Sequence, residues 1–136
     1  MEISEAREYL ESCHRAVMAT RRSSGAVQLS PVTCALDANG DVVVSTRETA
    51  MKVKNLLRDP RVSLCVLDDG FFGEWIQLDG SARVVKLPDA MEGLVEYYRR
   101  VAGEHPDWDE YRAAMERERR VLVVVTIERA GPDRAG

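Results

Sequence analysis

The sequence predicts a mainly β protein with helices, in which about six strands form an antiparallel barrel. The Asn39-Gly40 pair lies between two apolar segments and is the pair most typical of tight hairpin turns. Hairpins join antiparallel strands. Pro31 and the Asp79-Gly80 pair interrupt two of the strands, and interruptions of this kind let a sheet curve and close on itself.

Each expected strand is a run of apolar or β-branched residues between turn signals. The six strands are expected at residues 15–20, 27–36, 42–46, 62–67, 75–87 and 121–128. A β-bulge is expected in the fifth strand, at Asp79-Gly80. The tail, 130–136, contains Gly, Pro and charged residues and is expected to be loose.

Apolar residues at helical spacing predict four helices. They are expected at residues 4–12, 48–57, 89–102 and 108–119. Ser4, Thr49 and Asp107 are the expected N-caps, because side chains of these types accept hydrogen bonds from first-turn amides. Pro88 opens the third helix and Gly103 ends it.

Composition indicates one globular domain of 136 residues that is reduced and cytoplasmic. The net charge of −4 argues against nucleic acid as a partner. The N-terminus lacks the pattern of a signal peptide, and the longest apolar run, 121–125, is too short to span a membrane. Cys13, Cys34 and Cys65 are well separated and odd in number, which favours buried, reduced thiols over disulfides or metal ligands. A domain of this size is expected to hold a large ligand in a surface groove or between subunits.

Positive charge gathers in residues 45–61, which carry five basic and two acidic side chains. Ser45 and Thr46 come first, and a helix follows whose first turn presents free amides and a positive dipole end. Hydroxyls, amides and basic side chains together are the components of a phosphate site. The alternative is a basic helix face in solvent. Glycine-rich phosphate loops are absent from the sequence, which argues against a Rossmann or P-loop enzyme.

Aromatic residues gather in a second region, where Phe71, Phe72 and Trp75 border a glycine-containing loop. Rings at this place can form the wall of a planar ligand, although a hydrophobic cap or a dimer contact is favoured for the two phenylalanines. His14 and His105 lie near expected helix ends, where surface or capping roles are favoured over catalysis. No Ser-His-Asp set or metal-ligand spacing is present in the sequence, so no catalytic residue and no metal are assigned.

Most of the chain resembles a known family. Residues 45–56, 59–64 and 75–82 resemble the pyridoxamine-phosphate-oxidase-like (PNPOx-like) FMN-binding proteins. Residues 98–111 and 119–122 are similar to the B branch of the actinobacterial flavin/deazaflavin oxidoreductases. The resemblance implies a six-stranded antiparallel split β-barrel and a homodimer with the cofactor at the subunit interface. It also implies FMN or the deazaflavin F420 as cofactor, with F420 the usual ligand of the B branch.

The resemblance implies eight cofactor-binding residues by position. They are Lys52, Lys54, Asn55, Ser45, Thr46, Arg47, Gln28 and Trp75. Lys52 would contact the phosphate, Gln28 would face the ring, and Trp75 would approach from the partner subunit. Pro31 stands where related chains often carry a polar residue near the ring, which leaves F420 and FMN both open.

The expected function is that of an F420-dependent oxidoreductase. A reduced deazaflavin would donate a hydride to an electron-poor double bond of a small-molecule substrate, while the protein orients the cofactor and excludes water. One alternative is an FMN-dependent oxidase or reductase of the pyridoxamine-phosphate-oxidase type. The other is a non-enzymatic flavin- or F420-binding protein, because fold does not fix function.

Overall fold

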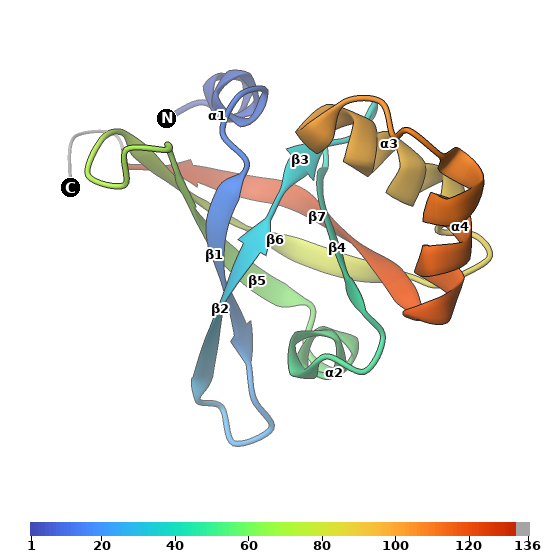
Figure 1. The fold of residues 1–136 in the computed structure, drawn as a ribbon. Coiled ribbons are helices and arrows are strands. Elements are labelled where there is room, and N and C mark those ends of the chain that lie inside the picture. Colours follow the sequence, from blue (N-terminus) through green and yellow to red (C-terminus); the bar gives the residue numbers. More distant parts are fainter. Residues whose placement is uncertain (133–136) are drawn as a thin grey trace.

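The structure, a computed structural model, describes residues 1–132. Seven strands form one antiparallel sheet in the order β2-β1-β5-β6-β7-β4-β3, and helices cover its ends and one outer face (Figure 1). The strands are β1 (Arg15–Arg21), β2 (Val27–Thr33), β3 (Ala35–Leu36), β4 (Val42–Arg47), β5 (Arg61–Leu67), β6 (Trp75–Val85) and β7 (Arg120–Gly131). The helices are α1 (Ile3–Leu10), α2 (Met51–Arg58), α3 (Met91–Ala102) and α4 (Trp108–Arg117).

The sheet curls because its two edge strands are consecutive in the chain. β2 pairs with β1 at one end of the strand order, and β3 pairs with β4 at the other end. Cys34 alone separates them, and its amide donates to the carbonyl oxygen of His14 at 2.7 Å. The segment 27–36, expected as a single strand, is therefore two strands, and the sheet has seven strands instead of six. This arrangement is consistent with a split barrel.

The predicted bulge in β6 is confirmed. Asp79 pairs with Arg129 of β7, whereas Gly80 pairs with Ile127, so the register shifts between the two residues. A Cβ atom at Gly80 would collide with the carbonyl oxygen of Thr126. Glycine at this position therefore lets the two longest strands pack closely where the sheet bends.

One of the three predicted N-caps is present. Asp107 caps α4, and its side chain accepts a hydrogen bond from the amide of Glu110 at 3.1 Å. Ser4 lies within α1, which begins earlier than expected, and Ala50 rather than Thr49 precedes α2. Neither α1 nor α2 has a side-chain cap, so the Met51 and Lys52 amides at the start of α2 are left for other partners.

The last strand is longer than predicted. β7 continues to Gly131, and Ala130 and Gly131 pair with Leu78 and Gln77 of β6. These two residues therefore belong to the sheet and not to a loose tail. Pro132 follows the strand, and the last four residues of the expected tail, 133–136, lie outside the described residues.

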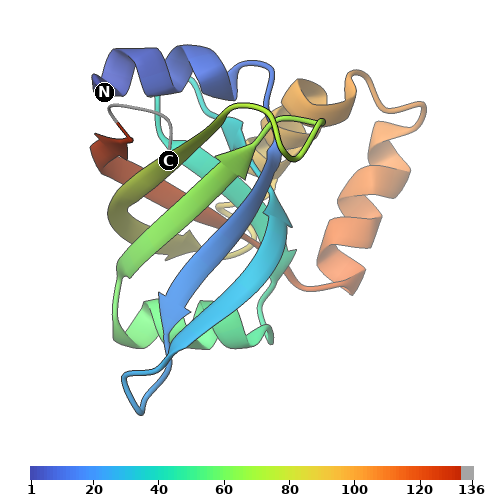
Figure 2. The ribbon, with the colours of Figure 1, turned by 90° about the vertical axis from the view of Figure 1, so that its left-hand side faces the viewer.

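Two apolar cores lie on opposite faces of β4 and β7. Val42, Val44 and Val123 point into the barrel, whose ends are covered by α1 and α2 (Figure 2). Val43 and Val124 point outward and pack under α3 and α4. Because both faces are covered, the sequences of these strands are continuous apolar runs and do not alternate between apolar and polar residues. No helix within residues 1–132 has the length and apolar character needed to cross a membrane.

Candidate functional site

A cleft of about 700 Å³ lies between the β2–β4 side of the barrel and the α3–α4 pair. Its volume falls within the range of small-molecule and cofactor sites. The barrel side of the cleft is lined by Pro31, Val32, Thr33, Ser45, Thr46 and Lys52. The helical side is lined chiefly by Tyr97, Tyr98, His105, Tyr111, Glu118 and Arg120.

One end of the cleft, here called the phosphate end, is formed by Ser45, Thr46 and Lys52 where β4 passes into α2. Thr46 is buried and Ser45 half-buried, and β4 pairs at this level with the buried residues Val121 and Leu122 at the start of β7. Within residues 1–132 the Lys52 ammonium has no ion-pair partner, and the Met51 and Lys52 amides donate to no acceptor. Uncapped amides at a helix start and a free ammonium are the donors that an anionic group requires.

A second charged group borders the phosphate end. Glu118 binds Arg120 at 2.9 Å and Arg47 at 3.5 Å. The Arg120 guanidinium, together with Arg47, holds the pKa of Glu118 below its usual range. Glu118 is therefore ionised at neutral pH and neutralises part of the positive charge that these arginines bring.

Aromatic rings form the opposite side of the cleft. We call Tyr97, Tyr98, His105 and Tyr111 the aromatic wall. The Tyr111 hydroxyl donates to the Leu94 carbonyl oxygen at 2.7 Å, and the Tyr97 hydroxyl donates to the Thr33 carbonyl oxygen at 3.1 Å. Burial raises the pKa of Tyr111 to about 12 and also raises the pKa of Tyr97. Both hydroxyls therefore stay protonated and are committed to the protein backbone.

In the single chain the side chains of Asn55 and Gln28 bond to each other, whereas the resemblance to the family implies that both contact the cofactor. Asn55 is buried, and its Nδ2 donates to Thr20 Oγ1 at 3.1 Å and to Gln28 Oε1 at 3.2 Å. Its Oδ1 accepts a hydrogen bond from Arg58 at 3.2 Å. These bonds tie α2 to β1 and β2. In the single chain, Asn55 and Gln28 thus hold the helix that carries Lys52.

The structure brings together three of the eight predicted residues, Ser45, Thr46 and Lys52, on the cleft lining. Lys54 and Arg47 are exposed and do not belong to the lining, although Arg47 pairs with Glu118, which does. Trp75 begins β6 and pairs with Leu67, at the opposite end of β5 from α2. It therefore lies away from this cleft within one chain.

The aromatic wall and Arg120 are site residues that the sequence does not predict. Tyr98, His105 and Tyr111 fall within the segment 98–111 that carried the resemblance to the B branch, but no role was assigned to their side chains. A helical face of tyrosines reads as core, and Tyr111 is indeed largely core. Only the packing of α3 and α4 beside β2 and β4 shows that these rings also border a cleft.

A family model described as pyridoxamine 5′-phosphate oxidase matches residues 3–132. The chain belongs to this family. Members of the family bind flavins. The resemblance expected from the basic helix and from the strand at 75–82 is thereby confirmed at the level of the superfamily.

Solved structures share the fold at low identity. A conserved hypothetical protein from Mycobacterium tuberculosis superposes with a TM-score of 0.78 at 22% identity, over 100% of this chain and 92% of that chain. An F420 reductase superposes with a TM-score of 0.70 at 20% identity, over 92% of this chain and 94% of that chain. HutZ, the heme storage protein from Vibrio cholerae, superposes with a TM-score of 0.71 at 16% identity, over 96% of this chain and 94% of that chain. At these identities the comparisons establish the fold alone.

Proposed function

We propose that the protein is an F420-dependent oxidoreductase that reduces an unsaturated small molecule. The observation that carries the proposal is the phosphate end of the cleft. There Lys52 and the uncapped start of α2 lie beside the hydroxyls of Ser45 and Thr46. These donors suit a ligand that has an anionic group, and the cleft continues beyond them, as far as the aromatic wall, with room for a ring system and an acceptor.

F420 and FMN share a phosphate joined to a tricyclic ring, and F420 also carries a glutamate tail. Arg47 is exposed next to the phosphate end, where it pairs with Glu118, and would serve these additional carboxylates. The similarity of residues 98–111 to the B branch supports F420 in the same way. When bound, the reduced deazaflavin supplies a hydride; the protein's residues hold the phosphate, orient the ring and shield it from water.

FMN is the second candidate, because the family binds flavins. A heme-binding role, as in some structural neighbours, fits the cleft poorly. The Nδ1 of His105 accepts a hydrogen bond from the Asp107 amide at 2.9 Å, so the ring proton sits on Nε2. An axial ligand needs a free lone pair on the nitrogen that faces the iron, and Nε2 in this tautomer has none.

The decisive experiment is ligand identification on the purified protein. Mass spectrometry of the extracted ligand and parallel titrations with F420 and FMN would measure which cofactor binds. Stoichiometric F420 binding, followed by anaerobic turnover of an enone or quinone with reduced F420, is expected. FMN retained at one per subunit without F420 binding would replace the first candidate by the second. F420 binding without turnover of any such acceptor would favour a cofactor-binding protein.

A further inference from the structure

We propose that His105 is a neutral hydrogen-bond donor that binds the carbonyl oxygen of a planar conjugated acceptor in the cleft. The inference rests on the proposed function, because it names the residue that orients the hydride acceptor in the same cleft. It concerns the end of the cleft opposite Lys52, on the connection between α3 and α4.

The first argument concerns the tautomer of His105. A backbone amide can only donate, so the 2.9 Å bond from the Asp107 amide makes Nδ1 an acceptor. The neutral ring then carries its proton on Nε2. His14 is held in the opposite way: its Nδ1 lies 2.9 Å from the carbonyl oxygen of Cys34, which can only accept. The Nδ1 atoms of the two histidines therefore differ, because that of His14 carries a proton and that of His105 does not.

The second argument concerns the other groups that line the cleft. The hydroxyls of Tyr97 and Tyr111 already donate to backbone carbonyls. Glu118 is ionised and paired with Arg120, so it can only accept. On the aromatic wall, this leaves the His105 Nε2–H and the Tyr98 hydroxyl without an acceptor among residues 1–132.

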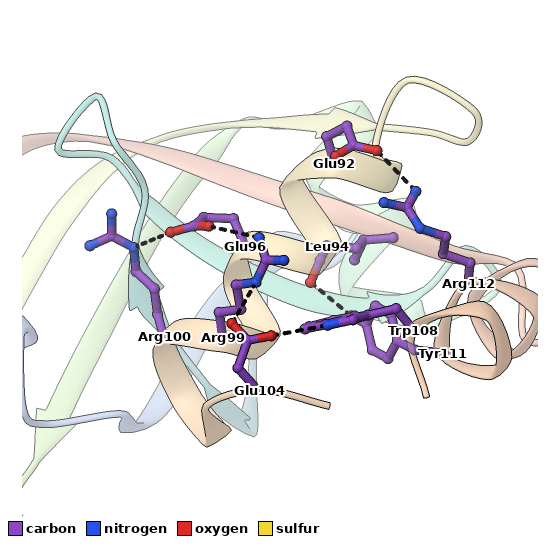
Figure 3. A network of polar contacts seen from close by, with 9 residues as sticks. All are labelled: Glu92, Leu94, Glu96, Arg99, Arg100, Glu104, Trp108, Tyr111 and Arg112. Atoms are coloured by element: carbon purple, nitrogen blue, oxygen red, sulfur yellow. Dashed lines mark hydrogen bonds and ion pairs between the residues drawn. The ribbon is translucent and has the colours of Figure 1, made fainter. Parts of the chain in front are cut away.

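The third argument is that the loop carrying His105 is held in place on both sides, as Figure 3 shows for the Glu104 side. Glu104 accepts from the Trp108 indole at 3.0 Å and pairs with Arg99 at 3.1 Å. The Arg99 guanidinium also lies over the Trp108 ring at 4.8 Å. On the other side, Asp107 caps α4. A donor fixed in this way needs little reorganisation when it binds a ligand.

The fourth argument concerns the shape of the ligand. The His105 ring packs against Tyr98 and Tyr111, with ring centroids 5.0 Å and 5.5 Å apart. The ring planes are tilted by 60° and 52° to one another, so the wall presents ring faces and edges together with the His105 and Tyr98 donors. Such a wall favours a conjugated ligand with an acceptor oxygen, such as a quinone. The phosphate end lies on the barrel side of the cleft, so the donor on the helical side is assigned to the acceptor and not to the cofactor.

The role of His105 is to stabilise charge without giving up its proton. A quinone becomes a hydroquinone when it gains one hydride and one proton. The reduced cofactor, which is thereby oxidised, supplies the hydride, and solvent supplies the proton. Negative charge develops on the quinone oxygen as the hydride arrives, and the Nε2–H bond becomes stronger at that stage. His105 begins and ends the reaction neutral.

The test compares His105→Phe, which removes the donor but retains a ring, with His105→Gln, which retains a donor at the same reach. The acceptor is 2,3-dimethyl-1,4-naphthoquinone, because its substituted ring carbons resist addition of cysteine. We expect kcat/KM for this quinone to fall about tenfold in His105→Phe, equivalent to about 1.4 kcal/mol, and to be largely retained in His105→Gln. The Kd for F420 is expected to stay unchanged in both. Unchanged kcat/KM in His105→Phe, or a weakened F420 Kd, would overturn the assignment to the acceptor.

A second readout does not depend on turnover. In a ¹⁵N-labelled sample, long-range ¹H–¹⁵N spectra report the tautomer of each histidine, and His14→Gln assigns the two signals. We expect an Nε2–H signature for His105, and a shift of its Nε2 resonance when the quinone is added while His14 stays constant. An Nδ1–H signature or an unmoved His105 resonance would overturn the proposal. Lack of binding of either cofactor by the wild-type chain would instead refute the proposed function, and the quinone titration would still decide the hydrogen bond.

Discussion

Asn55 Nδ2 donates to Thr20 Oγ1 across 3.1 Å, and this bond joins α2 to the inner side of β1. Both residues are buried, with 1% of their surfaces exposed. A buried polar group that loses its partner bears its full desolvation cost. The bond therefore holds α2 in place, and the position of Lys52 on that helix depends on Asn55.

We expect Asn55→Ala to lower the free energy of unfolding by about 1–3 kcal/mol, because Thr20 and Gln28 lose their donor. Urea unfolding followed by circular dichroism would measure the change. Lys54→Ala is the matched control, since Lys54 is exposed on the same helix and we expect no measurable loss of stability. An Asn55→Ala protein with wild-type stability and a selective loss of cofactor binding would instead assign Asn55 to the cofactor.

Lys52→Ala is expected to weaken cofactor binding by about 1–3 kcal/mol, the scale of a hydrogen bond to a charged group. Lys52 lines the cleft and has no ion-pair partner among residues 1–132, so its charge is available to a phosphate. Fluorescence titration with F420 would measure the Kd. Lys54→Ala keeps the same net charge as Lys52→Ala, and we expect it to have the smaller effect. Equal losses in the two variants would show that only the overall charge of α2 matters.

The sequence predicted that Ser45, Thr46 and Lys52 lie close together, because the signal for this arrangement is local. A strand, two hydroxyl residues and the start of a basic helix follow one another within a dozen positions, and the structure keeps that order in space. The antiparallel sheet and its bulge at Asp79-Gly80 were predictable for the same reason, since turn residues and glycine act on the backbone beside them.

What the sequence could not predict depends on contacts between distant segments. The break at Cys34 follows from β2 and β3 pairing with strands at opposite ends of the sheet, and no local signal marks it. Similarly, the hydrogen bonds from Asn55 to Thr20 and Gln28 join segments that are distant in the sequence, and no local pattern predicts them. The aromatic wall combines α3, the following loop and α4 with a cleft whose other side comes from β2 and β4.

Glu118→Gln tests the charge balance at the phosphate end. The pKa of Glu118 is lowered in the folded chain, chiefly by Arg120. Its ion pairs therefore stabilise the fold at pH values above the pKa that Glu118 has in the unfolded chain. That stabilisation is lost as the pH falls through the lowered, folded pKa. We therefore expect the variant to be less stable than wild type at pH 7, by at most about 1 kcal/mol, because the pair is partly exposed. The difference should vanish in acid.

The same variant is expected to bind F420 more tightly at pH 7, because Arg120 and Arg47 are no longer neutralised. Glu116→Gln is the control: Glu116 is exposed and forms no ion pair with any residue that the structure describes. Chemical unfolding between pH 3 and pH 8, together with a titration at pH 7, would measure both effects. A stability difference that grows as the pH falls would contradict the ion-pair assignment.

The homodimer is expected to form through the outward face of β2. Val27 and Leu29 are 46% and 68% exposed on this strand, and Pro31 on the same face borders the cleft. A second copy that covered this apolar face would also extend the cleft wall.

We expect sedimentation velocity to show a dimer for the wild type at micromolar concentration and a monomer for Leu29→Glu, because a buried carboxylate has no partner there. Phe72→Glu, in the loop before β6, is expected to remain dimeric even though Phe72 is 92% exposed. Dissociation of Phe72→Glu but not of Leu29→Glu would place the interface at that loop, and a monomeric wild type would remove the dimer altogether.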